Sequence, residues 1–305
     1  MKKSYELDMC NGPILGKILV FAIPLMISGI LQLLFNAADI IVVGRFTGSQ
    51  ALAAVGSTSA LINLIINLFI GVSVGANVVV ARNYGAKDYD GIHGAVHTSV
   101  LTAIWGGIIL IFVGILLARP MLEMMGTPED VIDLSVLYMR IYFVGMPAFM
   151  MYNFGAAILR AIGDTKRPLY FLTLSGVVNV VLNLFFVIVF HMGVAGVALA
   201  TIISQAISAF LIILCLMKMD GPCHLDFKHL KFHPEQLKSM LRIGLPAGLQ
   251  GAIFSISNVL IQSSVNSFGS QVMAGNTAAG NIEGFVYNSM NAVYQTSLSF
   301  TSQNM

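Results

Sequence analysis

Eight long apolar stretches constrain this chain of 305 residues more than any other feature. They lie at about 14–43, 51–81, 93–118, 134–159, 168–190, 194–217, 240–266 and 272–303. The hydrocarbon core of a bilayer is crossed by about 20 apolar residues in a helix. Backbone groups in lipid are satisfied only in helices or closed barrels, and these stretches lack the alternation of barrel strands. We therefore predict an all-α integral membrane protein with about eight transmembrane helices.

The composition excludes most soluble classes of protein. The chain is 57% hydrophobic and 10% charged, whereas soluble domains carry about 25% charged residues. Its net charge of +2 includes no basic stripe, so we expect no nucleic-acid partner. No phosphate-binding loop, serine-nucleophile motif or zinc-protease motif occurs, and the three cysteines have neither disulfide nor zinc spacing. We predict neither an enzyme nor a cofactor.

Basic residues in the loops predict the orientation. Two of them, Arg45 and Arg119, follow the first and third stretches. Thirteen occur on the other side of the membrane: Lys2, Lys3, Lys17, Arg82, Lys87, Arg160, Lys166, Arg167, Lys218, Lys228, Lys231, Lys238 and Arg242. Loops rich in Lys and Arg stay in the cytoplasm. The N-terminus is therefore expected in the cytoplasm, in a multi-pass protein of the inner (plasma) membrane.

The last two stretches repeat the first two. Ile23–Pro24 and Leu245–Pro246 each open a long apolar helix, 222 positions apart. Ser49-Gln-Ala-Leu-Ala53 resembles Ser270-Gln-Val-Met-Ala274, at 270 − 49 = 221. Both copies start on the same side of the membrane, and parallel repeats of this kind are typical of transporters.

We therefore predict an N-lobe of six helices at 1–220, a cytoplasmic linker at 221–239, and at 240–305 the first two helices of an incomplete C-lobe. The repeat offset predicts a complete form of about 217 + 221 = 438 residues plus a short tail. The linker carries His224, His229 and His233 beside Cys223. A solvated linker is favoured there over a metal site, because no helical face brings these residues together.

One carboxylate lies at membrane depth in the first stretch. Asp39 is followed by four apolar residues, and an ionisable group in the bilayer costs at least about 2.5–3.5 kcal/mol on insertion scales. Such a residue indicates an ion or proton site. Asn36 shares a helical face with Asp39, and Asn179 shares one with Asn183. For the asparagines, hydrogen bonding between helices is the competing interpretation.

Other polar residues at depth are less specific. Glu283 is a second candidate carboxylate, in the last stretch. Pro24, Pro147 and Pro246 lie inside predicted helices. Each removes a backbone hydrogen bond and permits a kink, which serves either as a hinge or as a static bend.

Several motifs together resemble a known family. The run Gln32-Leu-Leu-Phe-Asn-Ala-Ala-Asp-Ile-Ile-Val-Val-Gly-Arg-Phe-Thr-Gly48, followed by Ala51-Leu-Ala-Ala-Val-Gly56, resembles the first-helix signature of multidrug and toxic compound extrusion (MATE) transporters. Arg160-Ala-Ile-Gly-Asp-Thr-Lys-Arg-Pro168 is similar to their loop after the fourth helix. Asn179-Val-Val-Leu-Asn183 and Gly193-Val-Ala-Gly-Val-Ala-Leu-Ala-Thr201 resemble their fifth and sixth helices. The resemblance spans the whole chain.

The resemblance implies a twelve-helix, two-lobe fold with alternating access. It also implies a secondary antiporter that exports cationic or amphipathic drugs in exchange for H⁺ or Na⁺, and we expect a monomer in the lipid bilayer. The family's cation or proton site in the N-lobe maps onto Asp39, Tyr138, Asn179, Asn183 and Thr201, and its first-helix bend maps near the hinge candidate Pro24.

This chain departs from the family pattern in two places. Many members of this branch carry Asp where this chain has Asn183, which removes a negative charge and leaves the identity of the cation open. The helix 7 carboxylate of another branch would align near Phe254 and is absent, so Glu283 is a candidate to compensate.

Two alternatives remain. A flippase for lipid-linked sugars, from the same superfamily, would carry more cationic residues facing its central cavity, where only Arg140 is a candidate. A non-transporting channel or receptor is disfavoured by the parallel repeat and the carboxylate at membrane depth.

Overall fold

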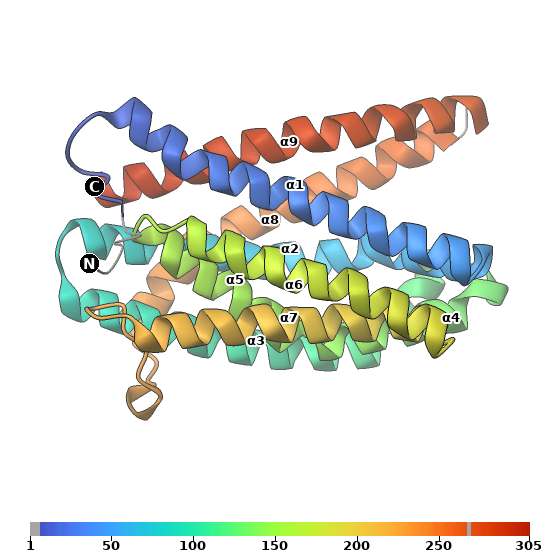
Figure 1. The fold of residues 1–305 in the computed structure, drawn as a ribbon, viewed down its shortest axis with the longest axis horizontal. Coiled ribbons are helices and arrows are strands. Elements are labelled where there is room, and N and C mark those ends of the chain that lie inside the picture. The colour runs from blue at the N-terminus through green and yellow to red at the C-terminus, as the bar shows by residue number, and fades with distance from the viewer. Residues whose placement is uncertain (1–6, 267–269) are drawn as a thin grey trace.

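The fold consists of long helices that run up and down side by side (Figure 1). The computed structural model describes residues 7–266 and 270–305, with side chains described except at 49, 57, 60, 259–260, 262–266 and 270–282. Lys2 and Lys3 therefore lie outside the described residues. In the described part, the α-helices are α1 Ile14–Phe46, α2 Ser49–Gly85, α3 Tyr89–Met124, α4 Glu129–Val144, α5 Met146–Ala161, α6 Lys166–Leu184, α7 Gly193–Lys218, α8 Pro234–Asn266 and α9 Ser270–Asn304.

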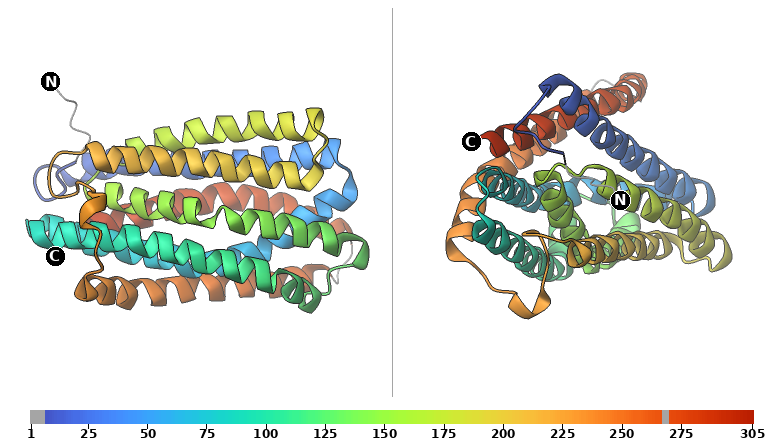
Figure 2. Two further views of the ribbon diagram at one scale, coloured as in Figure 1. Left: turned by 90° about the horizontal axis from the view of Figure 1, so that it is seen from below. Right: turned by 60° about the vertical axis from the view of Figure 1, so that its left-hand side comes forward.

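The start of α1, the end of α9 and the segment between α7 and α8 lie at the same end of the bundle, which we call the linker end (Figures 1 and 2). The helices alternate in direction from there, and α4 and α5 together make one passage. The last two helices pack against the first two, α8 along α2 and α9 along α1.

The described helices fit the expected membrane protein. Five of them are long and apolar enough to cross a bilayer: α1, α2, α3, α6 continued to Val189, and α7. The bent pair of α4 and α5 raises the number to six. The remaining helices, α8 and α9, contain 33 and 35 residues. At about 1.5 Å per residue they are long enough to span the membrane, so the arrangement is consistent with about eight passages.

The predicted single helix at 134–159 is wrong, because the chain breaks there into two helices. α4 ends at Val144, α5 begins at Met146, and the two meet at an angle of 49°. Pro147 lies in the first turn of α5, where its missing N–H costs no hydrogen bond within the new helix. Inside one continuous helix the same proline would remove a hydrogen bond and clash with the preceding turn.

The other helix irregularities differ from this break. α1 runs continuously through Pro24, and the Ser28 hydroxyl donates to the Pro24 carbonyl at 2.8 Å. α8 likewise runs through Pro246. By contrast, α6 is followed directly by a π-helical turn, Phe185–Val189. Wider turns of this type occur mostly as single insertions, often next to functional sites.

Glycines bring the backbones of α2 and α8 into direct contact. A Cβ added at Gly248 would lie 2.6 Å from the Leu68 carbonyl oxygen, and one at Gly244 would lie 2.7 Å from the Gly71 carbonyl oxygen. No real Cβ makes contacts this short with backbone atoms. Small residues allow close helix packing in membranes, and here they join α8 to α2.

The two copies of the repeat make equivalent contacts. A Cβ added at Gly29 of α1 would lie 3.2 Å from Asn288 Cβ of α9, and one at Gly251 of α8 would lie 3.6 Å from Asn67 Cβ of α2. The glycines are 251 − 29 = 222 positions apart and the asparagines 288 − 67 = 221. The pairing of α1 with α9 and that of α2 with α8 are therefore related by the offset of the sequence repeat.

The glycine contact predicts a position-dependent effect within α2. A Cβ at Gly75 would meet the Met240 carbonyl and lie 3.0 Å from Gly244 N, whereas one at Gly56 would meet nothing within 4 Å. Gly75→Ala should therefore lower the thermal midpoint of the purified protein, with a cost of about 1–3 kcal/mol from overpacking. Gly56→Ala should leave the midpoint unchanged or raise it, since alanine is the better helix former. Equal midpoints for the two variants in detergent would contradict this account of the contact.

Candidate cation site

Asp39 lies in the half of α1 farther from the linker end, 46 − 39 = 7 residues before the last residue of the helix. Its side chain is half-buried, and the Asn183 amide Nδ2 donates a hydrogen bond to its Oδ1. Asn183 belongs to α6 and is completely buried. A carboxylate from one helix thus meets an amide from another within the apolar part of the bundle.

The contact continues as a chain of polar groups into α7. Asn183 Nδ2 also donates to Asn179 Oδ1 at 3.2 Å, and Asn179 Nδ2 donates to Thr201 Oγ1 at 3.4 Å. The Thr201 hydroxyl donates in turn to the Val197 carbonyl at 3.0 Å. The structure therefore brings together four of the five residues named from the sequence.

One acceptor among these hydrogen-bonded side chains, Asn183 Oδ1, has no partner among the described residues. Both hydrogens of Asn183 Nδ2 are used, by Asp39 and Asn179. Its Oδ1 is buried and makes no hydrogen bond among the described residues. A buried carbonyl oxygen without a partner costs about 1–3 kcal/mol. Its position beside a carboxylate makes it a ready ligand for a cation or acceptor for a proton donor.

Tyr138, the fifth predicted residue, lies beside this chain. It is buried on α4 and stacks on Tyr142, with ring centroids 5.9 Å apart and planes at 29°. Both tyrosines are close enough to Asp39 to interact with it electrostatically. Tyr142 also hydrogen-bonds to the side chain of Gln205 on α7.

Two glycines allow the helices to approach at this site. Gly176 on α6 lies against the Phe35 ring of α1, where a side chain would collide. Gly145, at the break between α4 and α5, lies against Ile202 of α7, and an added Cβ would be 2.7 Å from Ile202 Cγ1. Both contacts lie close in sequence to site residues.

Three residues considered in the sequence lie elsewhere. Asn36 is exposed on α1 and does not join the chain of hydrogen bonds described above. Glu283 has an exposed side chain on α9, a helix that packs mainly against α1 and α2, so its proposed compensating role gains no support from a contact with the Asp39 chain. Arg140 is exposed on α4 and donates to the Ile115 carbonyl of α3 at 3.3 Å.

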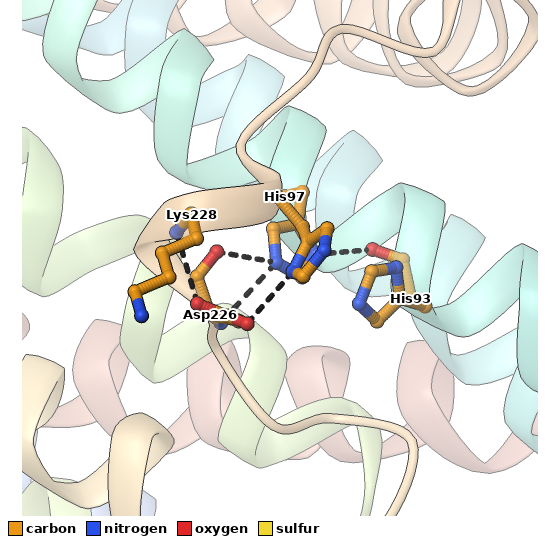
Figure 3. Close-up of polar contacts among 5 residues, drawn as sticks. His93, His97, Asp226 and Lys228 are labelled. Atoms are coloured by element: carbon orange, nitrogen blue, oxygen red, sulfur yellow. Dashed lines mark hydrogen bonds and ion pairs between the residues drawn. The ribbon is translucent and has the colours of Figure 1, made fainter.

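The segment between α7 and α8 is docked onto α3 more closely than a solvated linker would be (Figure 3). His97 of α3 is completely buried and uses both ring nitrogens, with Nδ1 2.8 Å from the His93 carbonyl and Nε2 3.3 Å from the Asp226 backbone N. The Asp226 carbonyl lies 3.2 Å from the same Nε2. The His233 N–H donates to Thr98 Oγ1 at 3.1 Å.

The side chains of this segment hold local turns. The Asp226 carboxylate accepts from Lys228 N at 2.9 Å and lies 2.7 Å from His229 Nδ1. These two contacts hold the pKa of Asp226 below its usual range. Cys223 and Leu225 are buried. No group of three His, Cys, Asp or Glu residues that could hold a metal occurs within the part of the chain that the structure describes.

Comparison with known proteins agrees with this architecture. The protein-family model MatE matches residues 24–185, more than half of the chain. The chain belongs to the MatE family. It is 32% identical over 274 residues to the probable multidrug resistance protein YoeA of Bacillus subtilis, covering 88% of this chain and 59% of that protein. It is 29% identical over 279 residues to the probable multidrug resistance protein YpnP of the same organism, covering 92% and 62%.

A solved transporter structure closely matches the fold of this MatE chain. It is described as the outward-facing conformation of a multidrug resistance MATE family transporter of the MOP superfamily. The TM-score is 0.90 at 27% identity, over 99% of this chain and 67% of that one. This MatE chain spans roughly three fifths of the length of YoeA and YpnP.

Sequence reasoning missed three features of this MatE chain. The sequence cannot show that Asn183 Oδ1 lacks a partner, because this depends on the orientation of the amide group in the structure. The π-helical turn at 185–189 has an apolar sequence like that of the helix before it. His97 did leave a signal: His93 and His97 are four apart at the start of an apolar helix, which puts both on one face.

The role of His97 can be tested by proteolysis of the segment that it holds. Removing the ring in His97→Ala leaves the Asp226 backbone without its partner and a void in the packed interior. Trypsin should then cut at Lys228 and Lys231 several-fold faster in the purified protein. His191→Asn is a matched control, because His191 is exposed at the other end of the bundle and asparagine tolerates its φ of 52°. Equal cleavage rates in the two variants would show that His97 does not hold the segment.

Proposed function

We propose that this MatE chain belongs to a secondary antiporter that exports cationic or amphipathic drugs in exchange for H⁺ or Na⁺. The observation that carries the proposal is the Asp39–Asn183 contact at membrane depth, with a buried carbonyl oxygen left open beside it. Ionisable groups at this depth are expensive and mark ion or proton pathways. The multidrug resistance and export names of the relatives support the class of substrate.

The residues present suit either coupling ion. For Na⁺, the ligands would be the Asp39 carboxylate, Asn183 Oδ1, and the oxygens of Asn179 and Thr201, since hard cations prefer oxygen ligands. For H⁺, Asp39 would take up the proton, and the neutral carboxyl group could donate to an amide oxygen. In both cases the bound ion cancels the one negative charge of the cluster, so the bilayer-facing helices can move without carrying an exposed charge.

The expected orientation and motion also belong to the proposal. The linker end would face the cytoplasm, because Lys and Arg are in excess in the loops at that end. We also expect the protein to lie in the inner membrane as a monomer. The N-lobe at 1–220 and the second half from residue 240 would rock against each other, and Pro24 in α1 would serve as a hinge. The glycine contact between α2 and α8 supports a pivot there, because it brings two backbones together at positions that carry no side chain.

The first test removes the charge. Asp39→Asn should abolish drug efflux driven by an ion gradient, because the neutral amide can neither take up a proton nor balance Na⁺. The measurement is ethidium efflux from vesicles under separate Na⁺ and H⁺ gradients, with membrane insertion checked by immunoblot. Asp133→Asn is the control, since Asp133 is exposed and makes only a surface ion pair with Arg119, at 3.4 Å. Full efflux in Asp39→Asn would remove the basis of the proposal.

The second test adds a charge. Asn183→Asp places a second carboxylate beside Asp39, which should strengthen the attraction for Na⁺ and lower the Na⁺ concentration for half-maximal efflux several-fold. The double variant Asp39→Asn, Asn183→Asp has the charge of the parent on the other helix. It should regain part of the efflux that Asp39→Asn loses. Sodium curves that overlay in the parent and Asn183→Asp would return Asn179 and Asn183 to the role of packing residues.

A further inference from the structure

A short segment before α1 crosses the linker end of the bundle. Residues 7–12, which we call the strap, are folded by their own contacts. The Asp8 carboxylate accepts from Cys10 N at 2.9 Å and from Asn11 Nδ2 at 3.1 Å, and these donors hold its pKa below the usual range. Lys17 Nζ of α1 donates to the Asp8 carbonyl at 2.5 Å and to the Asn11 carbonyl. The strap is thus fixed to the start of α1.

The strap contacts the end of α9, a helix of the second half. Met9 is buried and packs with Phe21 of α1 and Phe300 of α9. The two rings meet edge to face, with centroids 5.9 Å apart. Asn304 Nδ2 donates to the Met9 carbonyl at 3.2 Å, and the Cys10 thiol donates to the Gln303 carbonyl at 3.5 Å. One apolar side chain and two hydrogen bonds therefore join the strap to α9.

On its other side the strap contacts the first half. Gly163, between α5 and α6, has φ of 92°, and a Cβ added there would lie 2.6 Å from both the N and the O of Leu7. The glycine therefore has two functions here: it adopts a backbone conformation that L side chains rarely adopt, and it leaves room for the strap. The strap bridges the α5–α6 connection and the end of α9.

Beneath the strap, α9 is also bonded directly to the first half. Gln303 Nε2 donates to the Ala161 carbonyl of α5 at 2.5 Å. The Ser299 hydroxyl, which is completely buried, donates to Asn77 Oδ1 of α2 at 3.2 Å. All these contacts lie at the linker end, so opening of that end between α9 and the first half must break them together.

We propose that the strap is a clasp for the linker end, which holds α9 against the first half while that end is closed and releases it when that end opens. The inference rests on the proposed function, because it assigns the strap to one side of the alternating motion. Met9 in its pocket between Phe21 and Phe300 supplies the apolar anchor, and the Cys10 and Asn304 contacts set the register.

The native Cys10 allows a direct test in the purified protein in vesicles. Gln303→Cys puts a second thiol on the residue whose backbone carbonyl the Cys10 thiol contacts, and mild oxidation should link the two. The linked protein should lose drug efflux, and a reductant should restore it. The double variant Cys10→Ser, Gln303→Cys lacks the same Gln303 amide but cannot form the bond, so its efflux should not respond to oxidation. A linked protein that exports at the unlinked rate would overturn the clasp.

A second measurement does not depend on transport. In Ser299→Cys, the introduced thiol is buried between α2 and α9 and should react slowly with a water-soluble maleimide. Adding Met9→Asp puts a charge into the apolar pocket of the strap and should raise the labelling rate several-fold. Unchanged labelling would overturn the clasp even in a protein that exports drugs. Faster labelling in a protein that exports nothing would support the clasp while the antiporter proposal fails.

Discussion

The direct contact between the backbones of α2 and α8 is the interaction on which the arrangement of the two halves depends. Gly71, Gly75, Gly244 and Gly248 let the two backbones touch directly, so dispersion between main-chain atoms acts at close range there. A hydrogen bond from Asn67 to Ser255, at 2.9 Å, joins the same two helices. Lipid provides no hydrophobic force that would press helices together. Close approach is therefore the main source of attraction, and it is available only where the sequence is smallest.

The polar cluster lies away from this interface. Asp39, Asn179, Asn183 and Thr201 belong to α1, α6 and α7, all within the first six passages. Of these three helices, α1 also packs against α9. A change of charge at Asp39 therefore acts on a helix that also contacts the second half, through Phe21 and Gly29. In the proposed antiporter, α1 would link ion binding at Asp39 to the contacts with α9.

Apolar length predicted the helices of the fold, whereas the membership of the polar cluster was implied by the resemblance to MATE transporters. The four-residue spacing of Asn179 and Asn183 correctly placed both on one face of α6, whereas Asn36, paired with Asp39 by its spacing, is exposed. Spacing along one helix cannot give the rotation of that helix relative to another. Three features depend on that rotation and were therefore visible only in the structure. They are the hydrogen bond between Asp39 and Asn183, the unpartnered Asn183 oxygen and the stacking of Tyr138 on Tyr142.

The same limit explains the two errors. A proline in an apolar run signals a bend, but the sequence does not say whether the helix bends or breaks there, and here it breaks at an angle of 49°. The segment after α7 is polar in composition, which suggested solvent on all sides. Its docking depends on one buried ring in another helix, His97, and its own composition carries no trace of that partner.

The docked segment has a geometric consequence for any motion between the halves. Asp226 is held by His97, and His233 is held by Thr98, both on α3. α8 begins at the next residue, Pro234. The covalent tether between the halves is therefore effectively one residue long, although about fifteen residues separate α7 from α8. While these contacts hold, the start of α8 stays beside α3, so a motion of α8 turns it about this point and displaces its far end more than its start.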